Sequence, residues 1–110
     1  MIRLCTPSDA AQIAGIYRPF CEASHVSFET VAPSPEEMAA RIQKIIQSYP
    51  WIVEDRDGII TGYAYASRHR ERAGYRWAVD VGVYVHEEYR GRGIAKALYL
   101  SLFAILRIQG

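Results

Sequence analysis

The spacing of apolar residues along the chain alternates between two periods, and the change predicts a mixture of strands and helices. Alternating or β-branched and aromatic stretches predict strands at residues 2–5, 51–54, 59–66 and 75–85. Apolar side chains three and four positions apart predict helices at residues 6–20, 34–49 and 94–108. We therefore expect an α/β fold in which helices flank a mixed, mostly antiparallel sheet.

Two of the predicted helices begin with the same start signal. Thr6-Pro7-Ser8-Asp9 and Ser34-Pro35-Glu36-Glu37 each place a hydroxyl residue at the N-cap, proline at the first helical position and an acidic residue three positions after the cap. We expect the first helix to end after Phe20, although Pro19 could end it sooner, and Tyr49-Pro50 to end the second.

The connections in the middle of the chain predict an antiparallel meander. Asp57-Gly58 lies between two predicted strands and is a strong signal for a two-residue hairpin. Residues 68–74 read as a charged connection that leads into the long strand 75–85, and residues 24–33 read as a loop between the first two helices. The meander delivers the chain to the last helix.

The last predicted helix is apolar around most of its circumference. Its apolar residues are Ile94, Ala95, Ala97, Leu98, Tyr99, Leu100, Leu102, Phe103, Ala104, Ile105, Leu106 and Ile108. A helix of this kind has to be covered on more than one side. Because the sequence stops at Gly110, we expect the cover to come from further chain or from a partner subunit.

Composition narrows the class of protein. The 110 residues are 50% hydrophobic and 23% charged with a formal net charge of +1, which indicates one small globular domain and no bulk binding of nucleic acid. Cys5 and Cys21 lack metal-type or redox spacing, so we expect no metal and a reducing, cytoplasmic setting. The apolar run at 94–106 is shorter than the ~20 residues of a bilayer span and contains Lys96, so we expect no membrane insertion.

The junction between the last predicted strand and helix carries the candidate chemistry. Tyr89-Arg90-Gly91-Arg92-Gly93-Ile94-Ala95-Lys96 forms a glycine-rich turn that opens a helix. The first N–H groups of a helix have no intrahelical acceptor, and the helix dipole adds about half a positive charge there. Glycine lets the backbone approach a ligand closely, and Arg90, Arg92 and Lys96 add charge. This pattern predicts a phosphate socket; a tight structural corner is the alternative.

Two nucleotide-binding motifs do not fit this turn. A dinucleotide fingerprint has a third glycine where Lys96 stands, and a Walker loop has four residues between its glycines and ends in Gly-Lys-Ser/Thr. What does fit is Arg90-x-x-Gly93-x-Ala95, which resembles the Arg/Gln-x-x-Gly-x-Gly/Ala signature of the GNAT acetyltransferase superfamily.

The resemblance extends in order over essentially the whole chain, to the phosphinothricin and methionine sulfone N-acetyltransferases of that superfamily. The similar segments are Ser27-Phe28-Glu29-Thr30, Tyr49-Pro50-Trp51, Gly62-Tyr63-Ala64-Tyr65-Ala66, Tyr75-Arg76-Trp77 and Val83-Tyr84-Val85-His86. It implies a single domain over residues 1–110 that forms the N-terminal portion of a GNAT fold.

The resemblance also implies a cofactor site and a catalytic base. The backbone of Val83, Tyr84 and Val85 would bind the pantetheine arm of acetyl-CoA, and Arg90, Gly91, Arg92, Gly93, Ile94, Ala95 and Lys96 would surround its pyrophosphate. The glutamate that serves as base in the resembling family corresponds here to Asp80, which is one methylene shorter and would act through water. A structural carboxylate is the alternative for Asp80, and His86 and Glu88 are rival bases.

Substrate contacts follow from the same resemblance. Ala73, Gly74 and Tyr75 match positions that line the substrate, with Phe28, Glu29, Arg70 and Arg72 nearby. The implied reaction is acetylation of the α-amine of a small amino-acid analogue such as phosphinothricin, methionine sulfone or methionine sulfoximine; an aminoglycoside or a protein N-terminus is a weaker possibility.

The resembling domains continue for several strands and a helix beyond the point where this sequence stops, and that region carries their general acid. A different class of function therefore stays open, namely a catalytically silent acetyl-CoA-binding or oligomerising module. We expect a homodimer with small-molecule ligands and no nucleic-acid or membrane partner.

Overall fold

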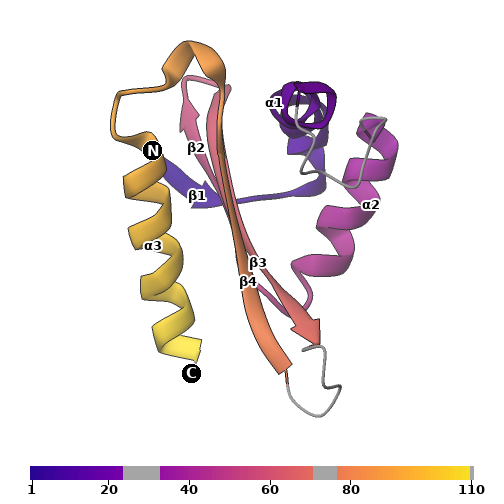
Figure 1. The fold of residues 1–110 in the computed structure, drawn as a ribbon, viewed down its shortest axis with the longest axis vertical. Coiled ribbons are helices and arrows are strands. Elements are labelled where there is room, and N and C mark those ends of the chain that lie inside the picture. The colour runs from indigo at the N-terminus through magenta and orange to yellow at the C-terminus, as the bar shows by residue number, and fades with distance from the viewer. Residues whose placement is uncertain (24–32, 71–76, 110) are drawn as a thin grey trace.

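The computed structural model describes residues 1–23, 33–70 and 77–109. They form one antiparallel sheet in the order β1-β2-β3-β4. The strands are β1 (Ile2–Leu4), β2 (Trp51–Arg56), β3 (Ile59–Arg70) and β4 (Trp77–Val85). The helices are α1 (Ala10–Ala23), α2 (Pro35–Ile45) and α3 (Ile94–Gln109), with short 3-10 helices η1 (Pro7–Asp9) and η2 (Glu87–Tyr89). Figure 1 shows three layers, with α1 and α2 on one face of the sheet and α3 on the other.

The predicted hairpin and the second helix start are confirmed. Asp57 and Gly58 both have positive φ, 52° and 88°, as a two-residue type I′ hairpin requires. At the start of α2, the Glu37 N–H donates to Ser34 Oγ (3.1 Å) and the Ser34 N–H donates to Glu37 Oε1 (3.1 Å). This reciprocal pair satisfies N–H groups that would otherwise have no acceptor at the helix start.

Each face of the sheet has its own apolar core. Ile13, Ile42 and Tyr63 belong to the core under α1 and α2, whereas Leu98 and Leu102 belong to the core under α3. The packing of α3 is tight, because a Cβ added to Gly62 would lie 2.9 Å from the Tyr84 carbonyl oxygen and 3.1 Å from Leu98 Cδ1. The inner side of α3 is therefore covered by this chain itself, while Tyr99, Leu100, Phe103 and Ile108 are exposed.

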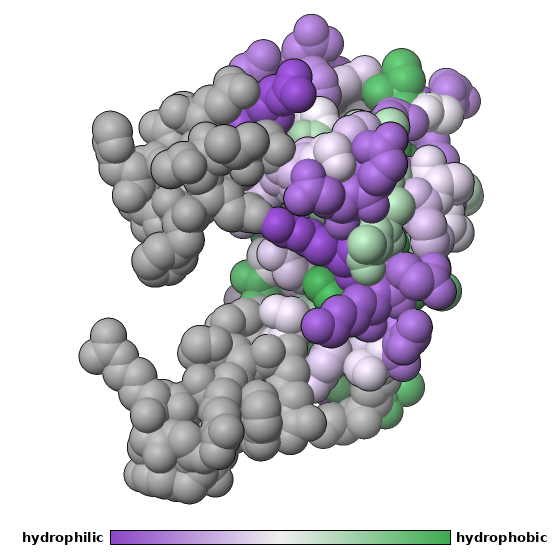
Figure 2. Space-filling model, turned by 90° about the vertical axis from the view of Figure 1, so that its right-hand side faces the viewer, coloured by the Kyte–Doolittle hydropathy of each residue, from purple (hydrophilic) through white to green (hydrophobic). Residues whose placement is uncertain are grey.

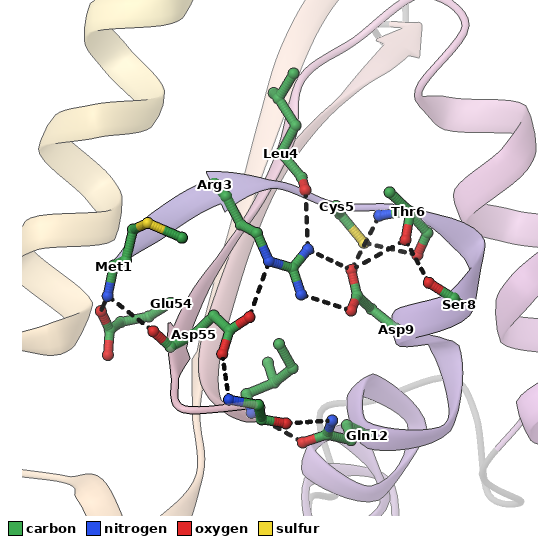
Figure 3. A network of polar contacts seen from close by, with 12 residues as sticks. Met1, Arg3, Leu4, Cys5, Thr6, Ser8, Asp9, Gln12, Glu54 and Asp55 are labelled. Atoms are coloured by element: carbon green, nitrogen blue, oxygen red, sulfur yellow. Dashed lines mark hydrogen bonds and ion pairs between the residues drawn. The ribbon is translucent and has the colours of Figure 1, made fainter.

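A polar network fixes β1 to η1 and β2 (Figure 3). The Arg3 guanidinium donates to both carboxylate oxygens of Asp9 (2.9 and 2.8 Å) and to Asp55 Oδ2 (3.0 Å). The N-terminal ammonium of Met1 donates to Glu54 Oε2 (2.7 Å). Hydrogen bonds from Arg3 hold the pKa of the Asp9 and Asp55 carboxyls below their usual range.

Several predicted boundaries are wrong. The second helix, predicted to continue to Tyr49, ends at Ile45 and is followed by a turn. The strand predicted at 59–66 continues as β3 to Arg70, so residues 68–70 are part of the sheet and not of a charged connection, because they pair with residues 77–79 of β4. The first predicted helix splits into η1 and α1, and α1 continues past Phe20 with Pro19 inside it. Pro19 is exposed, so water can serve the carbonyl that a proline leaves without its helical donor. Residues 24–32 of the loop predicted at 24–33, and residues 75–76 at the start of the last predicted strand, lie outside the described residues.

Candidate functional site

The glycine turn leads from the end of β4, through η2, into the start of α3. The His86 N–H donates to the Thr61 carbonyl (2.8 Å), and the Tyr89 N–H donates to the His86 carbonyl (2.9 Å). Gly91 and Gly93 follow with φ of 81° and 77°. A Cβ added to either glycine would meet nothing within 4 Å, so the turn needs glycine for its backbone conformation and not for space.

The start of α3 presents its backbone donors beside this turn. The first helical hydrogen bond runs from the Ala97 N–H to the Gly93 carbonyl (3.1 Å). The N–H groups of Ile94, Ala95 and Lys96 precede it and have no acceptor within the helix. The Ile94 side chain is buried against the sheet and anchors the helix start, whereas Ala95 and Lys96 are exposed. These donors and the helix dipole favour an anion at this position.

The two arginines of the turn rest on aromatic rings. The Arg90 guanidinium carbon lies 5.2 Å from the centre of the Phe20 ring, and that of Arg92 lies 5.2 Å from the Tyr89 ring. Because Phe20 belongs to α1, this cation–π contact ties the turn to the opposite layer. Sequence reasoning did not assign a role to Phe20. Its position three residues after Tyr17 is the only hint, and that spacing is equally typical of a core helix.

Strand β4 forms the edge of the sheet that the described residues build. Hydrogen-bonded and non-hydrogen-bonded pairs alternate along antiparallel strands. The bond from His86 to Thr61 therefore makes Tyr84 a hydrogen-bonded partner of Tyr63, while the main-chain polar groups of Val83 and Val85 face the open edge. A linear ligand with amide groups can pair with that edge in the manner of an added strand.

The side chain of Tyr84 belongs to an aromatic cluster on the face covered by α1 and α2. Its ring stacks on Tyr63 at 5.2 Å between centroids and meets Tyr17 and Phe20 edge-on at 5.4 and 5.0 Å. These arrangements are the favoured ones for aromatic pairs. Tyr84 is therefore a packing residue on this face, and its predicted cofactor contact would use the main chain only.

The candidate bases occupy different places. Asp80 lies in β4 opposite Ser67, in the row of positions that also contains Gly82 and Tyr84; its side chain lies outside the described residues. His86 caps η2, because its Nδ1 accepts from the Glu88 N–H (3.1 Å), and this contact gives His86 a structural role. Glu88 is exposed within η2.

The predicted substrate contacts cannot be placed in the same way. Phe28, Glu29, Arg72, Ala73, Gly74 and Tyr75 lie outside the described residues, and of the nearby arginines only Arg70 belongs to a described strand. Among the residues with described positions, no three metal-type ligands come together. No described helix has the length and apolar character needed to cross a membrane.

Comparison with known proteins identifies the family. A model of the acetyltransferase (GNAT) family matches residues 14–110, and the chain therefore belongs to the GNAT acetyltransferases. This confirms the family and the fold inferred from the glycine turn and the segments before it.

Two relatives within this family are named for particular acetyltransferase activities. Phosphinothricin N-acetyltransferase of Alcaligenes faecalis is 36% identical over 104 residues, covering 94% of this chain and 53% of that protein. The L-methionine sulfoximine/L-methionine sulfone acetyltransferase of Salmonella typhimurium is 29% identical over 108 residues, covering 92% of this chain and 60% of that protein.

A solved structure extends the comparison to three dimensions. The phosphinothricin acetyltransferase of Sinorhizobium meliloti in complex with AcCoA matches with a TM-score of 0.80 and 38% identity, covering 93% of this chain and 56% of that one. The chain thus spans between about half and three fifths of the length of these relatives.

Proposed function

We propose that this chain supplies the acetyl-CoA-binding part of an N-acetyltransferase that acts on the α-amine of small amino-acid analogues such as phosphinothricin, methionine sulfone or methionine sulfoximine. The observation that carries the proposal is the continuity of one path along the molecule. The open edge at Val83 and Val85 leads directly into the turn at Gly91 and Gly93 and the donors at the start of α3. An amide-containing arm followed by a pyrophosphate is the ligand that this sequence of groups fits.

Each group of the protein along β4 and the glycine turn matches one part of acetyl-CoA. The pantetheine amides would pair with the main chain of Val83 and Val85, and the pyrophosphate would accept hydrogen bonds from the N–H groups at the start of α3. Arg90, Arg92 and Lys96 would neutralise its charge. Bound in this way, acetyl-CoA supplies an activated thioester whose carbonyl carbon lies open to attack by an amine.

Asp80 is our candidate for the base. The acceptor amine must lose a proton as its nitrogen bonds to the thioester carbonyl carbon, and the C–S bond then breaks to release a CoA thiolate that takes up a proton. Asp80 would accept the amine proton through a water molecule, with an effect on rate of roughly 10²–10⁴. The described residues offer no candidate general acid for the thiolate.

A second function, that of a catalytically silent acetyl-CoA-binding or oligomerising module, is favoured by the exposed outer side of α3. Leu100 is 58% exposed and Tyr99 48% exposed, and large apolar side chains that gather on an exposed helix face are typical of an interaction surface. A homodimer that buries this side, in a cytoplasmic setting, is part of the proposal in both versions.

Two measurements on one sample separate these functions. Calorimetric titration with acetyl-CoA tests the cofactor site, and a thiol-release assay with methionine sulfone, methionine sulfoximine and phosphinothricin tests the transfer. Saturable binding with release of CoA supports the enzyme. Because this chain spans between about half and three fifths of the length of its relatives, we expect binding with little release from it alone; binding without release supports the module if a chain as long as the relatives also releases no CoA, and absence of binding contradicts both functions.

A further inference from the structure

We propose that the space between α2 and β3 is the acceptor pocket, and that Arg41 binds an anionic group of the amino-acid substrate there. This inference rests on the proposed function, because it assigns the second substrate of the same reaction. It is drawn from described residues on the face of the sheet that α1 and α2 cover.

Two adjoining hollows make up this space. The inner one, which we call the α2 cavity, has a volume of about 190 Å³ and is lined by Tyr17, Arg41, Trp51, Tyr63, Tyr65 and Ser67, among others. The outer one, of about 370 Å³, shares Arg41, Ile45 and Ser67 with it and adds Lys44 and Tyr49. Because they share these three residues, the two hollows lie next to each other between α2 and the sheet.

The walls of the α2 cavity are largely aromatic. Trp51 stacks on Tyr65 at 4.5 Å and on Tyr63 at 5.7 Å. The Tyr65 ring lies directly over Gly82, where an added Cβ would be only 2.8 Å from its Cε1. Flat apolar walls of this kind suit the short aliphatic chain and methyl group of a methionine or glutamate analogue.

The polar groups come from the two opposite walls of this space, which are α2 and the sheet. Arg41 and Lys44 bring positive charge at the α2 side, where Figure 2 shows a mainly hydrophilic surface with small apolar areas. Ser67 lies at the sheet side, opposite Asp80 in the strand register. A carboxylate bound by Arg41 would lie in a pocket whose sheet side is formed by β3, the strand that pairs with the one carrying the candidate base, and the α-amine is attached to the neighbouring carbon.

A buried donor adds to the chemistry of the α2 cavity. No described residue accepts a hydrogen bond from the indole N–H of Trp51, although the side chain is only 3% exposed. Buried polar groups are rarely left without a partner. A sulfone, sulfoximine or phosphinate oxygen in this cavity is a suitable acceptor for that donor.

The position of Trp51 in the wall provides the assay. In a Trp77→Phe variant, Trp51 is the one remaining tryptophan of the sequence, so its emission reports on the α2 cavity. We expect methionine sulfone and phosphinothricin to change this emission saturably. Arg41→Gln should raise the Kd about tenfold, the effect of losing one charge-assisted hydrogen bond. Arg107→Gln, an exposed arginine on α3, should leave the Kd unchanged.

Two ligands distinguish which anionic group Arg41 binds. If it binds the α-carboxylate, Arg41→Gln weakens both ligands, and the methyl ester of methionine sulfone binds equally to both proteins. If it binds the phosphinate, only phosphinothricin is affected. Circular dichroism checks that the variants fold, and calorimetry with methionine sulfone on the unmutated chain gives the Kd independently of Trp77→Phe.

Failure of the inference is distinguishable from failure of the proposed function. Acetyl-CoA binding without a saturable Trp51 response, or an unchanged Kd in Arg41→Gln for both ligands, overturns the acceptor pocket alone. Absence of acetyl-CoA binding overturns the proposed function.

Discussion

Replacement of Gly93 by alanine tests whether the turn depends on backbone conformation. Gly93 has φ of 77°, and nothing lies within 4 Å of an added Cβ. The substitution therefore creates no clash, and its cost comes from holding an L-residue in the left-handed region, about 1–2 kcal/mol. In a domain of this size that cost lowers Tm by roughly 4–16 °C, at about 4–8 °C per kcal/mol.

Gly15 provides the matched control. An added Cβ there also meets nothing within 4 Å, but Gly15 lies inside α1 with ordinary helical geometry. Gly15→Ala should therefore stabilise the chain by about 0.5–1 kcal/mol. Urea denaturation of both variants measures the two effects. Equal effects, or a Gly93→Ala variant as stable as the natural chain, would refute the conformational argument.

Three further predictions concern other parts of the structure. Gly62→Ala should destabilise the chain by about 1–3 kcal/mol in thermal melts, because the new Cβ would overlap the Tyr84 carbonyl and the Leu98 side chain; an unchanged Tm would contradict the tight packing of α3. Phe20→Leu should weaken acetyl-CoA binding about two- to fivefold in calorimetry, because Arg90 loses its ring contact of roughly 0.5–1 kcal/mol. Tyr99→Leu, on the outer side of α3, should leave the binding unchanged. Equal effects of the two substitutions would contradict the role of Phe20. The pKa of Asp9 in the folded chain lies below its usual value, so the ionised carboxylate stabilises the fold at a pH above that usual pKa, and this contribution is lost as pH falls below about 5. Asp9→Asn should therefore flatten the decline in the free energy of unfolding that urea denaturation measures between pH 6 and 3. An unchanged slope would show that other groups cause the acid sensitivity.

Local signals in the sequence predict most of the fold. Asp57-Gly58 fixes its hairpin because only two adjacent residues with positive φ close that turn. Ser34 and Glu37 fix the start of α2 through two hydrogen bonds that the sequence pattern contains in full. The turn at Gly91 and Gly93 can be predicted from the sequence for the same reason, because its backbone conformation and its positive charge come from neighbouring residues.

Features that depend on residues far apart in the sequence cannot be predicted from such local signals. Arg68–Arg70 look like a solvated connection, and only pairing with β4 makes them a strand. Phe20 acquires a role because α1 brings it to Arg90, which is 70 positions later in the sequence. The α2 cavity likewise arises from four separate elements, which carry Tyr17, Arg41, Trp51 and Ser67. The roles predicted for Asp80 and for the substrate contacts remain predictions.

The central claim is that acetyl-CoA lies along β4 and the glycine turn. Titration of the ¹⁵N-labelled chain with acetyl-CoA, followed by NMR, tests it directly because each backbone amide is observed separately. The account predicts saturable shifts of the amides of Val83 and Val85 and of residues 91–96, with Gly15 and the Asp57-Gly58 hairpin unchanged. Saturable shifts that leave residues 83–96 unaffected, or no shifts at millimolar acetyl-CoA, would contradict it.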